Sequence, residues 1–153
     1  MVSNLKIGII DYSFCNINSV LSACHDVTRN VEVITKPQEI KNFDKLILPG
    51  VGNFESAILK LTNLGFYETL IEHAKKEKDL LGICLGMQLL FENSEEDGFV
   101  RKGLGIYQIL LKNKFQYLIW GGLRFTFTIK IQELLKKFQI KVLFTLQIAT
   151  FVK

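Results

Sequence analysis

Four short apolar runs in the first part of the chain predict the strands of a buried sheet. They cover residues 5–11, 31–35, 44–50 and 79–84, with the sequences LKIGIID, VEVIT, DKLILPG and DLLGIC. Apolar residues follow one another in these runs with few polar interruptions, which is typical of parallel strands covered on both faces.

The segments between these runs repeat their apolar residues at helical spacing. Residues 16–27, 53–63 and 66–77 place apolar side chains three and four positions apart, and residues 85–93 predict a fourth helix entered through Gly86. Strands that alternate with helices predict an α/β fold, a parallel sheet with helices on both faces. In such sheets functional groups collect at the carboxyl ends of the strands.

Three stretches with unusual residues follow predicted strands. They are DYSFCN at 11–16, PGVGNF at 49–54 and CLGMQ at 84–88. Because the carboxyl ends of parallel strands meet at one edge of the sheet, the sequence predicts a single site there.

Cys84 stands between a predicted strand and a predicted helix, with Gly82 and Gly86 close on either side. Unpaired N–H groups at a helix N-terminus carry partial positive charge and favour a nucleophilic thiolate. The glycines would relieve crowding, as in the strand–nucleophile–helix elbow of hydrolases. A structural cysteine that fills apolar space is the alternative, and the glycines favour the nucleophile.

The glycine-rich stretch at 49–53 predicts a loop whose backbone N–H groups face an oxyanion. Such an anion forms when a thiolate attacks an amide. The stretch lacks the G-K-[ST] ending of a phosphate-binding loop, and an ordinary turn is the simpler alternative. Placed beside Cys84, it predicts an oxyanion hole formed by Val51, Gly52 and the N–H of Leu85.

Composition fits one globular domain, with 153 residues, 48% hydrophobic and 22% charged. No segment approaches the ~18 consecutive apolar residues that suggest a membrane span. Cys15, Cys24 and Cys84 show no metal-type pairing, and the N-terminus does not resemble a signal peptide. We therefore expect a cytoplasmic protein without a metal or another cofactor.

Charge divides the chain into two parts. Residues 1–105 contain 11 Lys and Arg against 14 Asp and Glu, whereas residues 106–153 contain 8 against 1. The net charge of +4 therefore comes from the tail and does not indicate a nucleic-acid surface on the predicted sheet. We expect one domain within residues 1–105 and an atypical basic tail that forms no separate domain.

Four stretches, in order, resemble a known family. They are IGIIDYSFCNINSV, LILPGVGNFESAI, GICLGMQLLFENSEE and GLG. Together they are similar to the glutamine amidotransferase subunit of imidazole glycerol phosphate synthase, a class I (triad) amidotransferase with a flavodoxin-like fold. The resemblance ends near residue 105, so the C-terminal part of that fold would be incomplete. Ser13 and Cys15 replace glycines of the family's D-Y-G-x-G-N loop.

The resemblance implies a reaction and two partners. Cys84 attacks the side-chain amide of L-glutamine, ammonia leaves, and water releases glutamate. The ammonia passes to a cyclase subunit, a (β/α)8 barrel that forms a heterodimer with the glutaminase in histidine biosynthesis. Gln88 matches a glutamine-contacting position, and Gly50 and Gly52 match the oxyanion strand that also binds substrate. Neither nucleic acid nor a membrane is expected as a partner.

A cysteine nucleophile of this kind needs a base and a group that orients it. The family supplies them as His-x-Glu downstream of the cysteine, and no such pair follows Cys84 here. The two histidines of the chain, His25 and His73, both precede Cys84 and are predicted to be surface residues. The triad is therefore incomplete, and we predict that the chain is inactive.

The tail allows two interpretations. Residues 123–131 alternate like a half-buried strand and residues 131–138 repeat at helical spacing, as in a basic segment that binds nucleic acid or a membrane. Read one step out of frame, however, residues 117–125 and 141–151 are compatible with two family stretches in family order. We favour a frameshift within codons 105–117, which would truncate the natural product.

Two other functions stay open. A related amidotransferase that feeds another ammonia-consuming synthase would carry the same motifs. A subunit that holds the cyclase without making ammonia would also lack the base.

Overall fold

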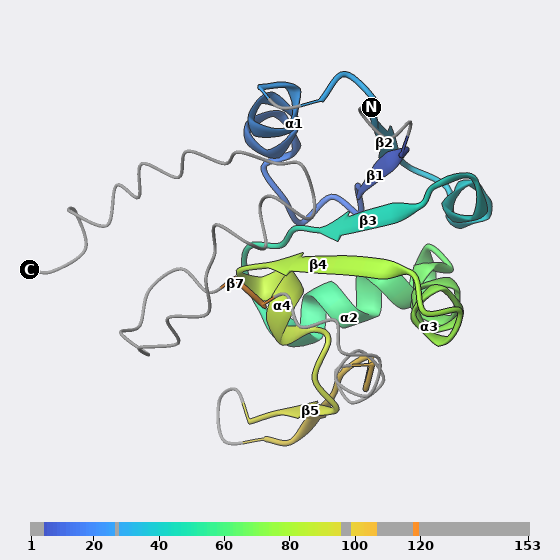
Figure 1. The fold of residues 1–153 in the computed structure, drawn as a ribbon. Helices are drawn as coiled ribbons and strands as arrows, with labels where there is room; N and C mark the ends of the chain where they lie inside the picture. Colours follow the sequence, from blue (N-terminus) through green and yellow to red (C-terminus); the bar gives the residue numbers. More distant parts are fainter. Residues whose placement is uncertain (1–4, 27, 96–98, 107–117, 120–153) are drawn as a thin grey trace, which may run out of the picture.

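The computed structural model describes residues 5–26, 28–95, 99–106 and 118–119. Five parallel strands form one sheet in the order β2-β1-β3-β4-β7 (Figure 1). The strands are β1 Ile7–Ile10, β2 Val31–Ile34, β3 Lys45–Leu48, β4 Asp79–Ile83 and β7 Leu118–Ile119. Each of the first four lies within a predicted apolar run, and the parallel pairing confirms the predicted α/β class.

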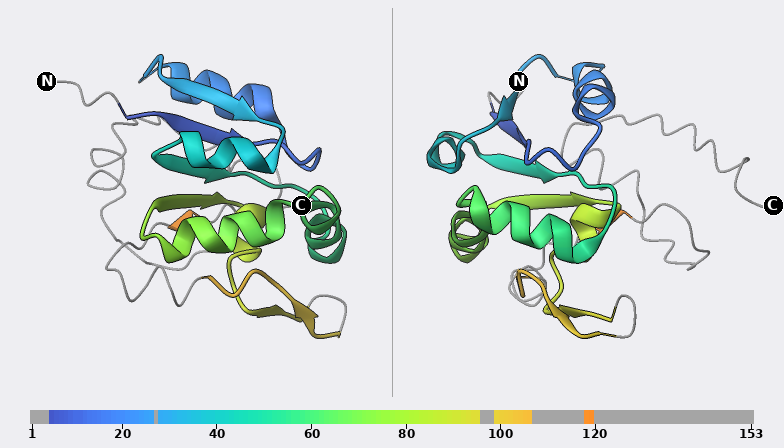
Figure 2. Two further views of the ribbon diagram at one scale, coloured as in Figure 1. Left: turned by 90° about the vertical axis from the view of Figure 1, so that its right-hand side faces the viewer. Right: turned by 180° about the vertical axis from the view of Figure 1, so that it is seen from behind.

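Helices cover both faces of the sheet, as predicted (Figure 2). The crossover helices are α1 Ile17–His25, α2 Phe54–Asn63 and α3 Phe66–Lys75. Asn16 and Asn53 cap α1 and α2, because their side chains accept hydrogen bonds from backbone N–H groups three residues on. A short 3-10 helix, Pro37–Asn42, precedes β3 and was not predicted.

The strands divide their apolar residues between two cores. Ile9 and Ile47 pack with the α1 side of the sheet, whereas Ile10, Leu46 and Leu48 pack with the α2 and α3 side. Successive residues of a strand point to opposite faces, so a strand that is covered twice needs apolar residues at almost every position. This explains why the runs do not alternate.

The helix after β4 is shorter than predicted. Only α4, Leu85–Gln88, forms, and the expected continuation to residue 93 is wrong. The returning segment 103–105 donates hydrogen bonds to carbonyl groups of this stretch: Gly103 to Glu92, Leu104 to Leu89 and Gly105 to Phe91, at 2.7, 2.8 and 3.0 Å. The Leu89 carbonyl is the one that the N–H of residue 93 would use in a longer helix. The chain then forms a small hairpin of β5 Asn93–Ser94 and β6 Arg101–Lys102.

β7 adds to the sheet beside β4, with Gly82 opposite Leu118 and Ile83 opposite Ile119. The predicted strand over 123–131 and helix over 131–138 lie outside the described residues, so the frameshift and the domain boundary near residue 105 stay predictions. Among the described helices, none has the length and apolar character needed to cross a membrane.

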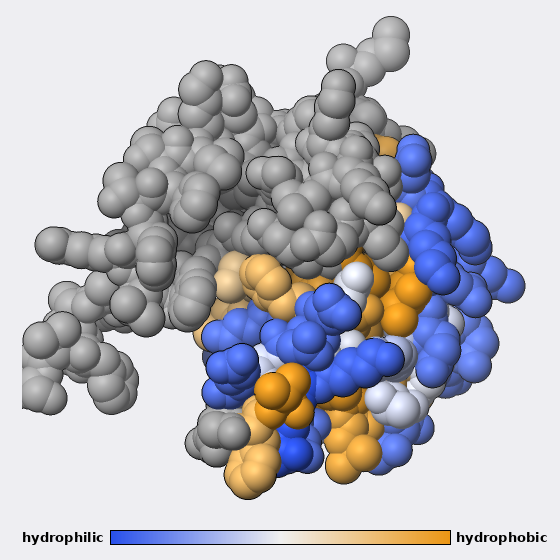
Figure 3. All heavy atoms as spheres, turned by 90° about the horizontal axis from the view of Figure 1, so that it is seen from below, coloured by the Kyte–Doolittle hydropathy of each residue, from blue (hydrophilic) through white to orange (hydrophobic). Residues whose placement is uncertain are grey.

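Apolar side chains also reach the surface, where they lie among hydrophilic ones on the face seen from below (Figure 3). The segment between β5 and β6 contributes Phe99 and Val100, which are 63% and 67% exposed. Arg101 lies over the Phe99 ring at 5.2 Å and pairs with Glu55 of α2 at 3.1 Å. This ion pair ties the hairpin to α2.

Candidate active site

Cys84 occupies a sharp turn between β4 and α4. Its backbone has φ 54° and ψ −121°, a conformation that residues with a side chain rarely adopt. Such a conformation costs about 1–3 kcal/mol and persists only where the surrounding structure holds it. The thiol is therefore presented on a strained strand-to-helix elbow, the geometry used by hydrolase nucleophiles.

Gly82 and Gly86 make the elbow possible because backbone passes close to both. A Cβ at Gly82 would lie 2.5 Å from the Met87 Cα, and one at Gly86 would overlap the carbonyl oxygen of Leu48. Backbone atoms cannot move aside as a side chain could. The two glycines thus let the first turn of α4 rest on the end of β3.

The glycine-rich loop after β3 lies against this turn. A Cβ at Gly50 would lie 2.8 Å from the Gly86 nitrogen and 3.1 Å from the Leu85 Cβ. Gly52 follows with φ 98°, a backbone conformation that favours glycine. The structure therefore brings the 49–53 loop and the cysteine elbow together at the carboxyl edge of the sheet.

The predicted oxyanion donors are not equally available. The Val51 N–H donates to the Phe14 carbonyl at 2.7 Å, so in this conformation it is not available to a substrate. Leu85 is the first residue of α4, where an N–H has no acceptor within its own helix. The elbow therefore offers a better donor than Val51.

Gln88 ends α4 one turn after Cys84, and its N–H donates to the Cys84 carbonyl at 3.3 Å. Residues four apart lie on the same side of a helix, so its half-buried side chain is on the side of Cys84. The substrate-contacting role of Gln88 stays a prediction.

The loop after β1 shows how Ser13 and Cys15 are accommodated. Ser13 adopts φ 71°, as a glycine would, and its N–H donates to the Asp11 carboxylate at 2.9 Å. Cys15 is half-buried, with the Ile10 carbonyl and the Asp11 carboxylate each 3.9 Å from its sulfur. Burial, then the Asp11 charge, raises the pKa of Cys15 to about 11. Cys15 is therefore a thiol at neutral pH.

The prediction that both histidines lie on the surface is wrong for His73. His25 is exposed, but His73 is 3% exposed, with Nε2 3.2 Å from the Asp79 carbonyl oxygen. Burial lowers the pKa of His73 to about 4. The charged residues around it suggested solvent, whereas its spacing from Phe66 and Leu70 placed it on the apolar face of α3.

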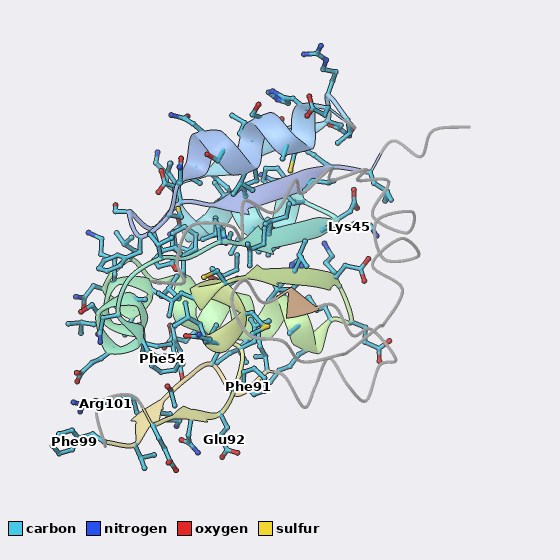
Figure 4. The ribbon with its side chains drawn as sticks, turned by 90° about the vertical axis from the view of Figure 1, so that its left-hand side faces the viewer. Lys45, Phe54, Phe91, Glu92, Phe99 and Arg101 are labelled. Atoms are coloured by element: carbon cyan, nitrogen blue, oxygen red, sulfur yellow. The ribbon has the colours of Figure 1, made fainter. Side chains whose placement is uncertain are left out.

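Neither histidine can serve Cys84 as a base. Asp79 begins β4 and Cys84 follows its end, so His73 contacts the opposite end of the strand, about 16 Å away at ~3.3 Å per residue. Lys45, which pairs with Asp79, lies at that end of the sheet, away from Phe54 (Figure 4). His25 ends α1 before the chain enters β2, so it too lies toward the amino ends of the strands.

A parallel α/β sheet that holds a cysteine in a strained elbow beside a glycine loop defines a nucleophile-elbow domain. Residues 8–117 match the family model described as a CobB/CobQ-like glutamine amidotransferase domain, and the chain belongs to that glutamine amidotransferase family.

Individual relatives agree with the family. The chain is 44% identical over 122 residues to imidazole glycerol phosphate synthase subunit HisH of Caldanaerobacter subterraneus, covering 76% of this chain and 60% of the relative. It is 45% identical over 102 residues to the HisH subunit of Wolinella succinogenes, covering 67% and 49%. The chain thus spans about half the length of the curated relatives it matches, and the predicted resemblance is confirmed.

A solved structure supports the fold. The crystal structure of a glutamine amidotransferase matches with a TM-score of 0.55 and 15% identity, over 66% of this chain and 52% of that chain.

Proposed function

We propose that this chain carries the nucleophile of a glutaminase that hydrolyses glutamine and supplies ammonia to the cyclase subunit of imidazole glycerol phosphate synthase in histidine biosynthesis. The observation that carries the proposal is the strained Cys84 elbow beside the 49–53 loop. The names of the similar proteins support the choice of synthase.

The reaction has two steps. The Cys84 sulfur attacks the side-chain carbonyl carbon of glutamine, the C–N bond breaks, and ammonia leaves with the thiol proton to give a thioester. Water then attacks the thioester, releasing glutamate and restoring the thiol. In each step the N–H of Leu85, with that of Gly52, would stabilise the oxyanion, and Gln88 would hold the substrate.

Proton transfer is the step for which neither histidine of the chain is in place. A base that takes the thiol proton and returns it to ammonia contributes roughly 10²–10⁴-fold. His25 and His73 lie toward the opposite end of the sheet from Cys84. The chain alone should therefore form the covalent adduct with a reactive glutamine analogue but should not turn glutamine over.

The missing base favours a second candidate, a subunit that binds the cyclase barrel as a heterodimer without producing ammonia. A chain that binds the cyclase in a pull-down but shows no glutamine turnover would support this candidate. The three free cysteines support the reducing cytoplasm as the compartment.

The test combines labelling, turnover and gene sequence. The purified chain, with and without the cyclase and its nucleotide ligand, is treated with a glutamine-analogue alkylating agent and separately assayed for glutamate. We expect labelling at Cys84, none in Cys84→Ala, and no turnover. Resequencing codons 105–117 tests the frameshift, and a frame-restored chain should gain turnover that Cys84→Ala abolishes. Turnover by the present chain that His73→Ala removes would contradict the proposal.

A further inference from the structure

A buried hydroxyl group without a hydrogen bond lies beside the elbow. Tyr12 follows β1, and its side chain is 0% exposed. Among the described residues, its Oη is the buried side-chain atom that has no hydrogen-bond partner. Folded proteins rarely leave such a group unpaired, because burial removes its hydrogen bonds to water. The hydroxyl therefore calls for an explanation.

The position of this hydroxyl points to the nucleophile turn. A Cβ at Gly50 would lie 2.5 Å from Tyr12 Oη and 2.8 Å from the Gly86 nitrogen, so the phenol oxygen and the first turn of α4 crowd the same point. The Tyr12 ring is held by stacking on Phe14, with ring centroids 6.0 Å apart and planes 9° from parallel. The hydroxyl is thus fixed next to the elbow.

Among the described residues, the thiols of Cys15 and Cys84 act electrostatically on the phenol. Burial raises the pKa of Tyr12 well above 10, and negative charge on Cys15 or Cys84 raises it further. The phenol therefore keeps its proton and is a hydrogen-bond donor. Cys15, beside Asp11, has a pKa raised to about 11, so it is not the anion that needs a donor at neutral pH.

We propose that Tyr12 is a positioning residue for Cys84: its hydroxyl, unpaired in the structure, donates a hydrogen bond to the Cys84 sulfur when that sulfur is a thiolate. The inference rests on the proposed nucleophile role of Cys84, but it does not depend on glutamine turnover.

Tyr12→Phe removes the hydroxyl and keeps the stacked ring. The hydroxyl is unpaired while Cys84 is a thiol, so we expect the urea midpoint of unfolding to stay the same or rise. Alkylation of Cys84 by iodoacetamide at neutral pH should slow about tenfold, as expected for loss of a hydrogen bond to a charged group. The pH profile of that rate should move about one pH unit higher. Peptide mapping reports Cys15, Cys24 and Cys84 separately.

Tyr67→Phe is the matched control, because the Tyr67 hydroxyl donates to the Gly103 carbonyl at 2.7 Å. Its loss should lower the urea midpoint and leave Cys84 alkylation unchanged. If Tyr12→Phe behaves in the same way, Tyr12 is structural and the inference is wrong. A change in the Cys15 rate with an unchanged Cys84 rate overturns it equally.

If the Tyr12→Phe chain does not fold, a second measurement tests the inference. Biosynthetic replacement of tyrosine by 3-fluorotyrosine makes the phenol a stronger donor, so Cys84 should react faster, and an unchanged rate contradicts the inference. The wild-type rate separates the two proposals. If wild-type Cys84 is alkylated no faster than an unstructured thiol, its role as nucleophile is wrong. If Cys84 is alkylated fast and changes at Tyr12 leave that rate unchanged, only the positioning role of Tyr12 is wrong.

Discussion

The two ends of the sheet use their polar groups in opposite ways. At the amino end, where the strands begin, Lys45 pairs with Asp79 at 2.5 Å and His73 contacts the Asp79 carbonyl at 3.2 Å. Lys6 pairs with Glu32 at 2.9 Å. Partners at this end lie on neighbouring strands or on the helix that leads into β4. Their contacts join the elements of the fold.

At the carboxyl end, the residues are strained or unpaired. Among the described residues, three that are not glycine have positive φ: Cys84 and Ser13 lie at this end, and Glu77 lies before β4 at the other. The Tyr12 hydroxyl, which has no partner among the described residues, also lies at this end. Strain and unmet hydrogen bonds lower stability, so finding more of them at the carboxyl end favours chemistry there. The comparison separates a supporting end from a reactive end, and the following changes test that separation.

The largest effect should come from Gly86→Ala at the reactive end. A Cβ there overlaps the Leu48 carbonyl, so α4 must move off β3, at a cost of about 3 kcal/mol in the free energy of unfolding. Labelling of Cys84 should fall to that of an unstructured thiol. Gly105→Ala is the control: it has φ 64° but open space around it, so it should cost about 1 kcal/mol and leave labelling unchanged. Normal labelling in Gly86→Ala would contradict the role of the glycine.

Acidification should lower the free energy of unfolding by an amount similar to that of Gly86→Ala, through His73 at the supporting end. The pKa of His73 is lowered to about 4 in the fold against its ordinary 6.5, so between these values the unfolded chain binds more protons. Stability should therefore fall by about 3 kcal/mol as the pH drops from about 6.5 to about 4. His73→Leu should remove this part of the pH dependence, and His25→Leu should not. The free energy of unfolding of each variant is measured by urea titration at several pH values. If it depends on pH equally in both variants, His73 is not a buried neutral histidine.

Asp79→Asn should have an intermediate effect. It leaves the Lys45 ammonium, whose side chain is 12% exposed, without its carboxylate partner. Because the pair is not fully buried, we expect a loss of about 2 kcal/mol, measured by chemical denaturation. Cys84 alkylation should not change, since the pair lies at the other end of β4. Slower alkylation would show that the two ends are coupled.

Arg101→Ala should have the smallest effect. Its pair with Glu55 involves side chains 36% and 57% exposed, so breaking it should cost below about 0.5 kcal/mol. Glu55→Gln should match it, and the double variant should cost no more than either single change. A larger loss of thermal stability would mean that the hairpin depends on this contact.

Sequence patterns predicted the parts of the molecule that depend on local composition. Continuous apolar runs gave the strands, and the glycines around Cys84 gave the elbow, because close backbone contact selects glycine wherever it occurs. The short α4 was not predictable, since the groups that end it come from residues 103–105. His73 was misplaced because charged neighbours in sequence were given more weight than its helical face.

The sequence predicted which segments meet at the carboxyl edge of the sheet, but not their hydrogen bonds. The proximity of Cys84 to the 49–53 loop follows from parallel topology alone. That the Val51 N–H is already bonded to Phe14, and that the Tyr12 hydroxyl is unpaired, depends on loop conformations without a periodic signal.

The contact between Gly86 and the Leu48 carbonyl also has a consequence for the order of folding. The elbow takes its shape by resting on β3, a strand made more than 30 residues earlier, whose register with β4 pairs Leu48 with Gly82. Cys84 can therefore be held in its strained turn only once β3 and β4 have paired. The proposed reactivity of Cys84 should therefore depend on the assembled sheet and be missing from a nascent or unfolded chain.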